Sequence, residues 1–96
     1  AILHKIFFNS SFGFMPFSVY IIYSKSIDSY YVGQTSNLSD RLRRHNNSGS
    51  KATKKAKDWT LVHEELFETR SEAVTRETYI KKQKSKAFIE RLIAEQ

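Results

Sequence analysis

The chain has 96 residues, of which 40% are hydrophobic, and this length favours a single domain with one modest core. It has no cysteine, which excludes disulfides, thiolate metal sites and a cysteine nucleophile and fits a cytoplasmic location. The net charge of +6 favours a nucleic acid as partner, with a basic surface for solubility as the alternative, and no apolar run approaches the roughly 18 residues of a membrane span.

The N-terminal segment, residues 1–14, is apolar but lacks the apolar core and cleavage site of a secretory signal. Met15 is followed by Pro16, and we expect Met15 to be the natural start of the protein. Residues 1–14 are then a peripheral, non-native extension, and residues 15–96 form a single domain.

Two strands open this domain. Residues 17–24 (FSVYIIYS) are rich in aromatic and β-branched residues and predict a buried strand. Residues 30–35 (YYVGQT) predict a second strand, and the short polar connection between the two makes them an antiparallel hairpin. Gly33 inside the second strand indicates a bulge, or a position that another backbone or a ligand approaches closely.

A helix and a third strand follow. Thr35 or Ser36 can cap a helix over residues 37–46, in which two leucines lie one turn apart. A polar loop over residues 46–58 then leads to a strand over residues 59–67.

Two further helices end the chain. Thr69 and Glu72 form a capping-box pattern for a helix over residues 70–83. Ser85 can cap a last helix over residues 86–95. The expected fold class is α+β, in the order β-β-α-β-α-α, with a small three-stranded antiparallel sheet flanked by about three helices.

One carboxylate does not fit a plain apolar core. Glu77 lies on the apolar stripe of its helix, between Ala73 and Ile80. A carboxylate that faces a core is costly unless it is paired or binds a cation. The alternative is an edge position at which Glu77 pairs with Arg76, Lys81 or another basic group.

A histidine and several tyrosines are also candidates for a functional site. Arg41 and His45 lie four residues apart, on one face at the margin of the apolar stripe of their helix. The alternative for His45 is a hydrogen-bonded core or boundary residue. Four tyrosines cluster in the hairpin, where aromatic residues are also ordinary strand residues. They are Tyr20, Tyr23, Tyr30 and Tyr31.

These residues form a pattern that resembles the GIY-YIG nuclease family. Ser18-Val19-Tyr20, ten residues, and then Tyr31-Val32-Gly33 resemble the paired tripeptides that name the family. Arg41 and His45 follow at the family's spacing, and Glu77 is similar to its metal-binding glutamate. The resemblance covers residues 17–93 and is closest to small stand-alone bacterial members, which are related to the nuclease domain of the repair excinucleases.

Two departures from the family pattern are visible. Ser18 replaces the first glycine, and valines at positions 19 and 32 replace isoleucines while keeping the β-branched character. Several family members carry an asparagine near the end of the domain, and no convincing counterpart follows Glu77 here. One supporting contact of the family's site is therefore not expected in this chain.

The resemblance implies a metal-dependent DNA endonuclease with a role in DNA repair or processing. Glu77 would hold Mg²⁺ or Mn²⁺, and Arg41 would donate to the scissile phosphate. Tyr31, or with less support Tyr20, would act as the general base. His45 would accept its proton or orient it.

Lysines are expected to supply the affinity for DNA, through contacts to backbone phosphates. The alternative is a solvated, solubilising surface. No helix-turn-helix, zinc finger or RNP-like motif is present, so recognition is expected to follow the DNA backbone or its shape, with room for a protein partner. The lysines are Lys51, Lys54, Lys55 and Lys57 in the loop and Lys81, Lys82, Lys84 and Lys86 near the C-terminus.

Two other classes of function compete with the endonuclease. One is a catalytically silent nucleic-acid-binding module that keeps the GIY-YIG fold. Such a module has no need of a glutamate on an apolar stripe, so Glu77 favours the endonuclease. The other is a plain interaction domain whose basic surface serves solubility, and which would lack the steep salt dependence of phosphate contacts.

Overall fold

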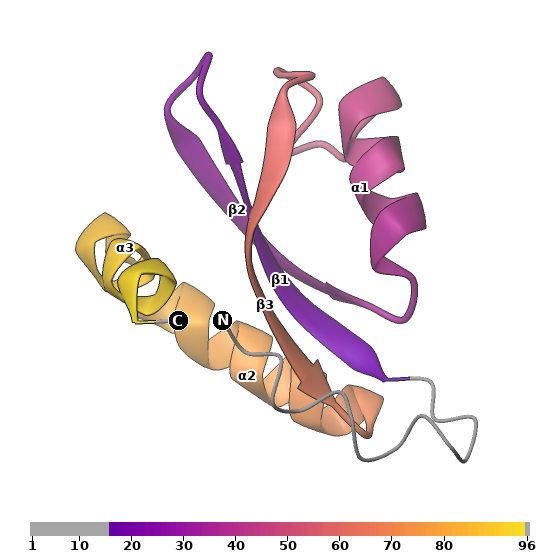
Figure 1. Cartoon of the computed structure of the whole chain (residues 1–96), viewed down its shortest axis with the longest axis vertical. Helices are drawn as coiled ribbons and strands as arrows, with labels where there is room; N and C mark the ends of the chain where they lie inside the picture. Colours follow the sequence, from indigo (N-terminus) through magenta and orange to yellow (C-terminus); the bar gives the residue numbers. More distant parts are fainter. Residues whose placement is uncertain (1–15, 96) are drawn as a thin grey trace.

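The computed structural model of the chain describes residues 16–95, so the expected N-terminal extension, residues 1–14, lies outside the described residues. The described part contains one sheet and three helices in the predicted order (Figure 1). The elements are β1 (Phe17–Ser24), β2 (Ser29–Thr35), α1 (Leu38–Asn47), β3 (Trp59–Phe67), α2 (Arg70–Lys82) and α3 (Lys86–Ala94).

The sheet has the strand order β2-β1-β3, and both pairings are antiparallel, as the sequence predicted. The central strand β1 therefore contacts both of its neighbours along its length. In the register of the hairpin, Tyr20 lies opposite Gly33. The pairing with β3 shifts between Ile21, which faces His63, and Ile22, which faces Leu61. This bulge in β3 increases the local twist of the sheet.

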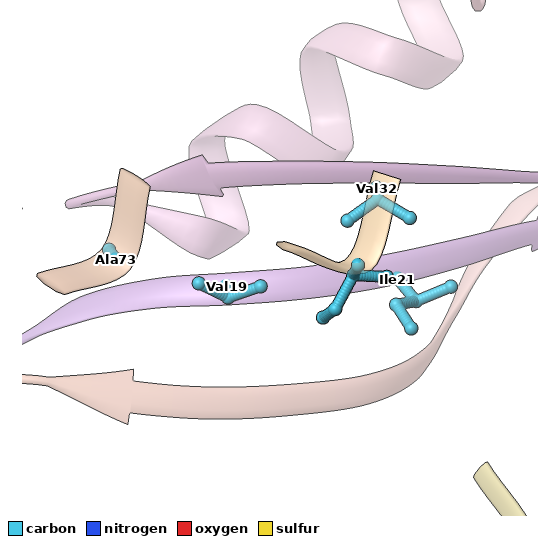
Figure 2. Packing of buried hydrophobic residues seen from close by; sticks show 5 residues of the cluster. Val19, Ile21, Val32 and Ala73 are labelled. Carbon is cyan, nitrogen blue, oxygen red and sulfur yellow. The ribbon is translucent and has the colours of Figure 1, made fainter. Parts of the chain in front are cut away.

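Helices cover the two faces of the sheet unequally. Figure 1 shows α1 beside one face, while α2 and α3 lie along the other. On the face of α2, Val19, Ile21 and Val32 pack against Ala73 and Ile80 (Figure 2). The alternation of side chains along a strand places these β1 residues on the face opposite to that of Tyr20.

The second apolar cluster fills the space beneath α1. Tyr20 and Ile22 of β1 pack with the buried Trp59, and the partly buried Leu38 and Leu42 of α1 pack against this cluster. Alternate residues of β1 thus belong to two different cores. Tyr20 lies in the core that α1 covers, and this places it beside the next helix in the chain.

The helix N-termini follow the sequence signals with one exception. The capping box of Thr69 with Glu72 and the cap by Ser85 are both present, as predicted. The prediction that Thr35 or Ser36 caps α1 is wrong: the cap is Asn37, whose side chain accepts from the backbone N–H of Asp40. Thr35 instead accepts the Asn37 N–H at 3.1 Å, which fixes the turn before the helix.

Within residues 16–95, no helix has both the length and the apolar composition needed to cross a membrane.

Candidate active site

Tyr20 is completely buried, and the strand beside it makes room for its ring. A Cβ atom on Gly33, which lies opposite Tyr20, would come within 2.5 Å of the Tyr20 hydroxyl oxygen. The register of the hairpin is regular at Gly33, so the bulge expected there as one possibility is absent. The close neighbour is a side chain of the adjacent strand, and any residue larger than glycine would displace it.

The Tyr20 hydroxyl is held by His45 of α1. Tyr20 Oη and His45 Nε2 are 2.8 Å apart, and His45 Nδ1 lies 2.8 Å from Thr53 Oγ1 in the following loop. His45 is 3% exposed, so these contacts account for both of its ring nitrogens in a buried position. A strand, a helix and a loop therefore meet at one imidazole.

Burial and charge set the protonation states of this pair. Burial lowers the pKa of His45, and the charges of Arg41 and Arg44 lower it further, so the imidazole is neutral at neutral pH. Burial, with a contribution from Tyr31, raises the pKa of Tyr20 to about 12. Glu77 also raises this pKa, and Arg41 opposes the rise. The Tyr20 phenol is therefore protonated at neutral pH.

A pocket of about 190 Å³ opens beside this pair. The Tyr31 and His45 rings lie at its wall with their centroids 5.0 Å apart, and the Tyr20 ring lies behind them, 6.4 Å from that of Tyr31. The volume is below the 300 Å³ or so of a small-molecule site and suits a compact anion such as a phosphate. The lining residues are Tyr31, Arg41, Arg44, His45, Ser48, Gly49 and Ser50.

Glu77 lies on α2, at the place the apolar stripe predicted. Ala73 and Ile80 on either side of it are fully buried, while the Glu77 side chain is 17% exposed. Its carboxylate pairs with the Lys81 ammonium at 2.7 Å, and that ammonium lies 5.8 Å from the centroid of the Tyr31 ring. Glu77 does not line the 190 Å³ pocket, but Lys81 connects it to Tyr31 at the pocket wall.

The structure thus brings four of the five predicted catalytic residues into direct neighbourhood. Tyr31, Arg41 and His45 line the pocket, and Tyr20 supports His45 from behind. Glu77 is near enough for its charge to act on Tyr20, although it lies outside the lining.

A buried charged cluster attaches α2 to β3. Arg76 donates from Nε and Nη2 to the two oxygens of Glu65, at 2.8 and 3.1 Å, and His63 lies 2.8 Å from the same carboxylate. Burial alone would raise the pKa of Glu65, but these hydrogen bonds and the charge of Arg76 lower it to about 2. Arg76 therefore pairs with Glu65 and not with Glu77, and it fixes the face of α2 on which Glu77 lies.

The two groups of lysines differ in their surroundings. The four loop lysines are exposed, while Thr53 and Ala56 between them are buried. At the C-terminal group, Lys81 pairs with Glu77 and Lys86 pairs with Asp28 at 2.8 Å. The lysines exposed in the two groups are Lys51, Lys54, Lys55, Lys57, Lys81, Lys82, Lys84 and Lys86.

Several residues of the site were not among the predicted ones. Thr53 binds His45, and Arg44 adds a second guanidinium to the pocket. Arg44 could have been found from its position one turn after Asp40 and beside His45 in an exposed basic run. Thr53 carries no such signal, because a threonine in a lysine-rich loop is ordinarily a solvated residue.

Comparisons with known proteins identify the family of this chain. A family model described as the GIY-YIG catalytic domain matches residues 16–91. A UPF0213 protein of Clostridium perfringens is 46% identical over 65 residues, which cover 67% of this chain and 69% of the relative. A UPF0213 protein of Staphylococcus haemolyticus is 40% identical over 78 residues, which cover 76% of this chain and 94% of the relative. No solved structure matches the chain significantly.

The fold and the matched family model define a catalytic domain of the nuclease class. The chain belongs to the GIY-YIG family, and its UPF0213 relatives are small stand-alone members. The resemblance stated from the tyrosine tripeptides is therefore confirmed.

Proposed function

We propose that this protein is a divalent-metal-dependent endonuclease that hydrolyses a phosphodiester bond in DNA, with a role in DNA repair or processing. The observation that carries the proposal is the convergence of Tyr31, Arg41 and His45 on one phosphate-sized pocket, with Glu77 joined to the same place through Lys81. These residues come from a strand and two helices, so only the fold brings them together.

Two guanidiniums would bind the phosphate. Arg41 and Arg44 both line the pocket, and a guanidinium can donate two parallel hydrogen bonds to phosphate oxygens. Arg41 is also near enough to Tyr20 to lower the pKa of its hydroxyl, so this cation lies at the pocket before the substrate arrives. This arrangement favours stabilisation of the charge that develops on the phosphate in the transition state.

We assign the general base to Tyr31. Tyr20 is fully buried, and its pKa is raised to about 12, so it meets neither the access nor the acidity that a base for water requires. Tyr31 lies at the wall of the pocket that Arg41 also lines, and the Lys81 ammonium is 5.8 Å from the centroid of its ring. The Tyr20–His45 pair forms the rigid wall against which Tyr31 packs.

The residues fit a metal ion that needs few protein ligands. No group of three or more His, Cys, Asp or Glu that could hold a metal occurs in the described part of the chain. Mg²⁺ binds through one or two carboxylates and keeps several waters, and Glu77 supplies one carboxylate that is mostly buried. When bound there, the ion would offset phosphate charge and lower the pKa of a bound water.

A catalytically silent DNA-binding module is the second candidate, and one observation favours it. Lys81 neutralises Glu77 within the chain, so the carboxylate is not left unpaired when no metal is bound. In this reading Glu77 and Lys81 are an ordinary helix pair of the (i, i+4) type. The two candidates make opposite predictions for Glu77.

The test is a cleavage assay on plasmid and branched DNA with Mg²⁺, Mn²⁺ or EDTA, for the wild type, Glu77→Gln and the exposed control Glu68→Gln. We expect metal-dependent cleavage by the wild type and the control, and none by Glu77→Gln. An (i, i+4) ion pair on a helix, such as the pair of Glu77 with Lys81, contributes only about 0.3–0.5 kcal/mol. The free energy of unfolding of Glu77→Gln should therefore differ from that of the wild type by no more than about 0.5 kcal/mol. An inactive wild type, or an active Glu77→Gln, would contradict the proposal.

A further inference from the structure

A continuous chain of hydrogen bonds runs from the buried centre of the sheet to the partly exposed loop between α1 and β3, residues 48–58, which we call the lysine loop. It passes from Tyr20 Oη to His45 Nε2, from His45 Nδ1 to Thr53 Oγ1, and from Thr53 Oγ1 to Ser50. Tyr20 and Thr53 are fully buried, and His45 is 3% exposed. Buried polar groups must satisfy their donors and acceptors within the protein, so the direction of each bond can be assigned.

The assignment begins at Tyr20. The buried Tyr20 phenol has one hydrogen, and that hydrogen needs an acceptor within the protein. Among the described residues, His45 Nε2 is the acceptor within hydrogen-bond distance of Tyr20 Oη. The neutral imidazole therefore accepts at Nε2 and carries its own hydrogen on Nδ1.

The other end of the chain agrees with this direction. Thr53 Oγ1 has one hydrogen and two lone pairs. It accepts the Ser50 backbone N–H at 2.9 Å and, on this assignment, the His45 Nδ1–H at 2.8 Å, which fills both lone pairs. Its own hydrogen then points to Ser50 Oγ at 3.1 Å. The opposite tautomer would leave the buried Tyr20 hydrogen without an acceptor.

We infer that Thr53 is a positioning residue that holds His45 as the Nδ1–H tautomer, so that Nε2 accepts the Tyr20 hydrogen. The inference rests on the proposed function, because it explains how the Tyr20–His45 pair, against which Tyr31 packs, is held in place at the pocket. It also gives the lysine loop a second role beyond contact with phosphates. The loop carries the hydroxyl that orients the imidazole.

A substitution at Thr53 can separate this role from the folding of the loop. The Trp59 indole donates to the Thr53 backbone carbonyl at 3.0 Å, and the Thr53 N–H donates to the Ser50 carbonyl at 3.1 Å. Both bonds involve the backbone, so Thr53→Val keeps them, together with the shape of the side chain. It removes the hydroxyl, and with it the bonds to His45 Nδ1 and to Ser50. Thr53→Ser keeps the hydroxyl and loses a methyl group.

The test uses the full chain with ¹⁵N-labelled histidine, at neutral pH. The His45 resonances are identified by their loss in His45→Gln. We expect wild type and Thr53→Ser to show a protonated Nδ1 and an unprotonated Nε2, and Thr53→Val to show a tautomer mixture. Cleavage should fall by on the order of tenfold to a hundredfold in Thr53→Val and be restored in Thr53→Ser.

The outcomes separate this inference from the proposed function. A wild-type spectrum with the hydrogen on Nε2, or a Thr53→Val spectrum identical to the wild type, would overturn the role of Thr53. If Thr53→Val fails to fold, the wild-type spectrum still decides the tautomer. A wild type with the expected tautomer but without cleavage would support the positioning role and contradict the nuclease.

Discussion

Gly33 is the position at which the sheet admits a side chain from the next strand. The Tyr20 hydroxyl occupies the space where a Cβ atom would lie, 2.5 Å from the oxygen. The glycine is therefore needed for packing, since its backbone is in an ordinary extended strand. Its absence of a side chain is what lets Tyr20 reach His45.

We predict that Gly33→Ala lowers both stability and activity. The added methyl group must push the Tyr20 ring away from His45, and overpacking of this kind costs about 1–3 kcal/mol. Urea denaturation and cleavage assays measure the two effects. In a Tyr20→Leu background the same change should cost much less, because the conflict has been removed. Additive losses in the double variant would show that Gly33 and Tyr20 are not coupled.

The residues of the site that follow a regular spacing could be predicted, and the others could not. Arg41 and His45 are four residues apart on a helix, so their shared face follows from helix geometry. Thr53 reaches His45 only because the loop turns back at Gly49, whose φ of +72° is in the left-handed region. A loop has no period, so its inward-facing residues cannot be read from the sequence.

At the scale of elements, the segment between α1 and β3 has two sides. Thr53 and Ala56 anchor it inward, while Lys54, Lys55 and Lys57 are exposed. The second lysine group is less free, because Lys81 and Lys86 are in ion pairs. The loop is therefore the stronger candidate for the surface that contacts the DNA backbone phosphates.

We expect the triple variant Lys54→Ala, Lys55→Ala, Lys57→Ala to bind duplex DNA more weakly at low salt. The slope of log affinity against log salt should become shallower by about one for each phosphate that the loop no longer neutralises. Fluorescence anisotropy across a salt series measures both, and Lys25→Ala in the β1–β2 turn is the matched control. Unchanged binding would contradict this role of the loop and would indicate that Lys82 and Lys84 contact the phosphates instead.

The limits of the elements were predictable to within about a residue, because strand composition and capping residues mark them locally. The sequence did not predict which residues of β3 point to which face of the sheet. The bulge near Val62 changes which residues point to α2, so the alternation along the strand cannot be followed through it. The buried pair of His63 and Glu65 was missed for this reason, since a polar pair two residues apart reads as the solvent face.

At the scale of the whole molecule, the Glu65 cluster joins the sheet to the helix that carries Glu77. The Glu65 pKa of about 2 lies below its ordinary value of 4.5. A carboxylate whose folded pKa is lowered stabilises the fold fully above the ordinary value. That contribution disappears as the pH falls toward the folded value.

We therefore predict a loss of stability between about pH 4.5 and pH 2, on the order of 3 kcal/mol from this group. Urea denaturation at a series of pH values measures it. In Glu65→Gln the fall over this range should be clearly smaller, and stability at pH 7 should be lower because Arg76 loses a charged partner. An equal acid response in both proteins would show that Glu65 does not govern it.

The ion pair between Glu77 and Lys81 has a consequence for how this chain can change by descent. Because the lysine balances the carboxylate, the folded protein does not depend on a bound ion, and exchange of Glu77 for an uncharged residue costs folding little. Selection for a stable fold alone would therefore hardly constrain which residue occupies this position. A lineage that stopped cutting DNA could drift there freely, so the pressure that keeps a glutamate at position 77 would come from the reaction.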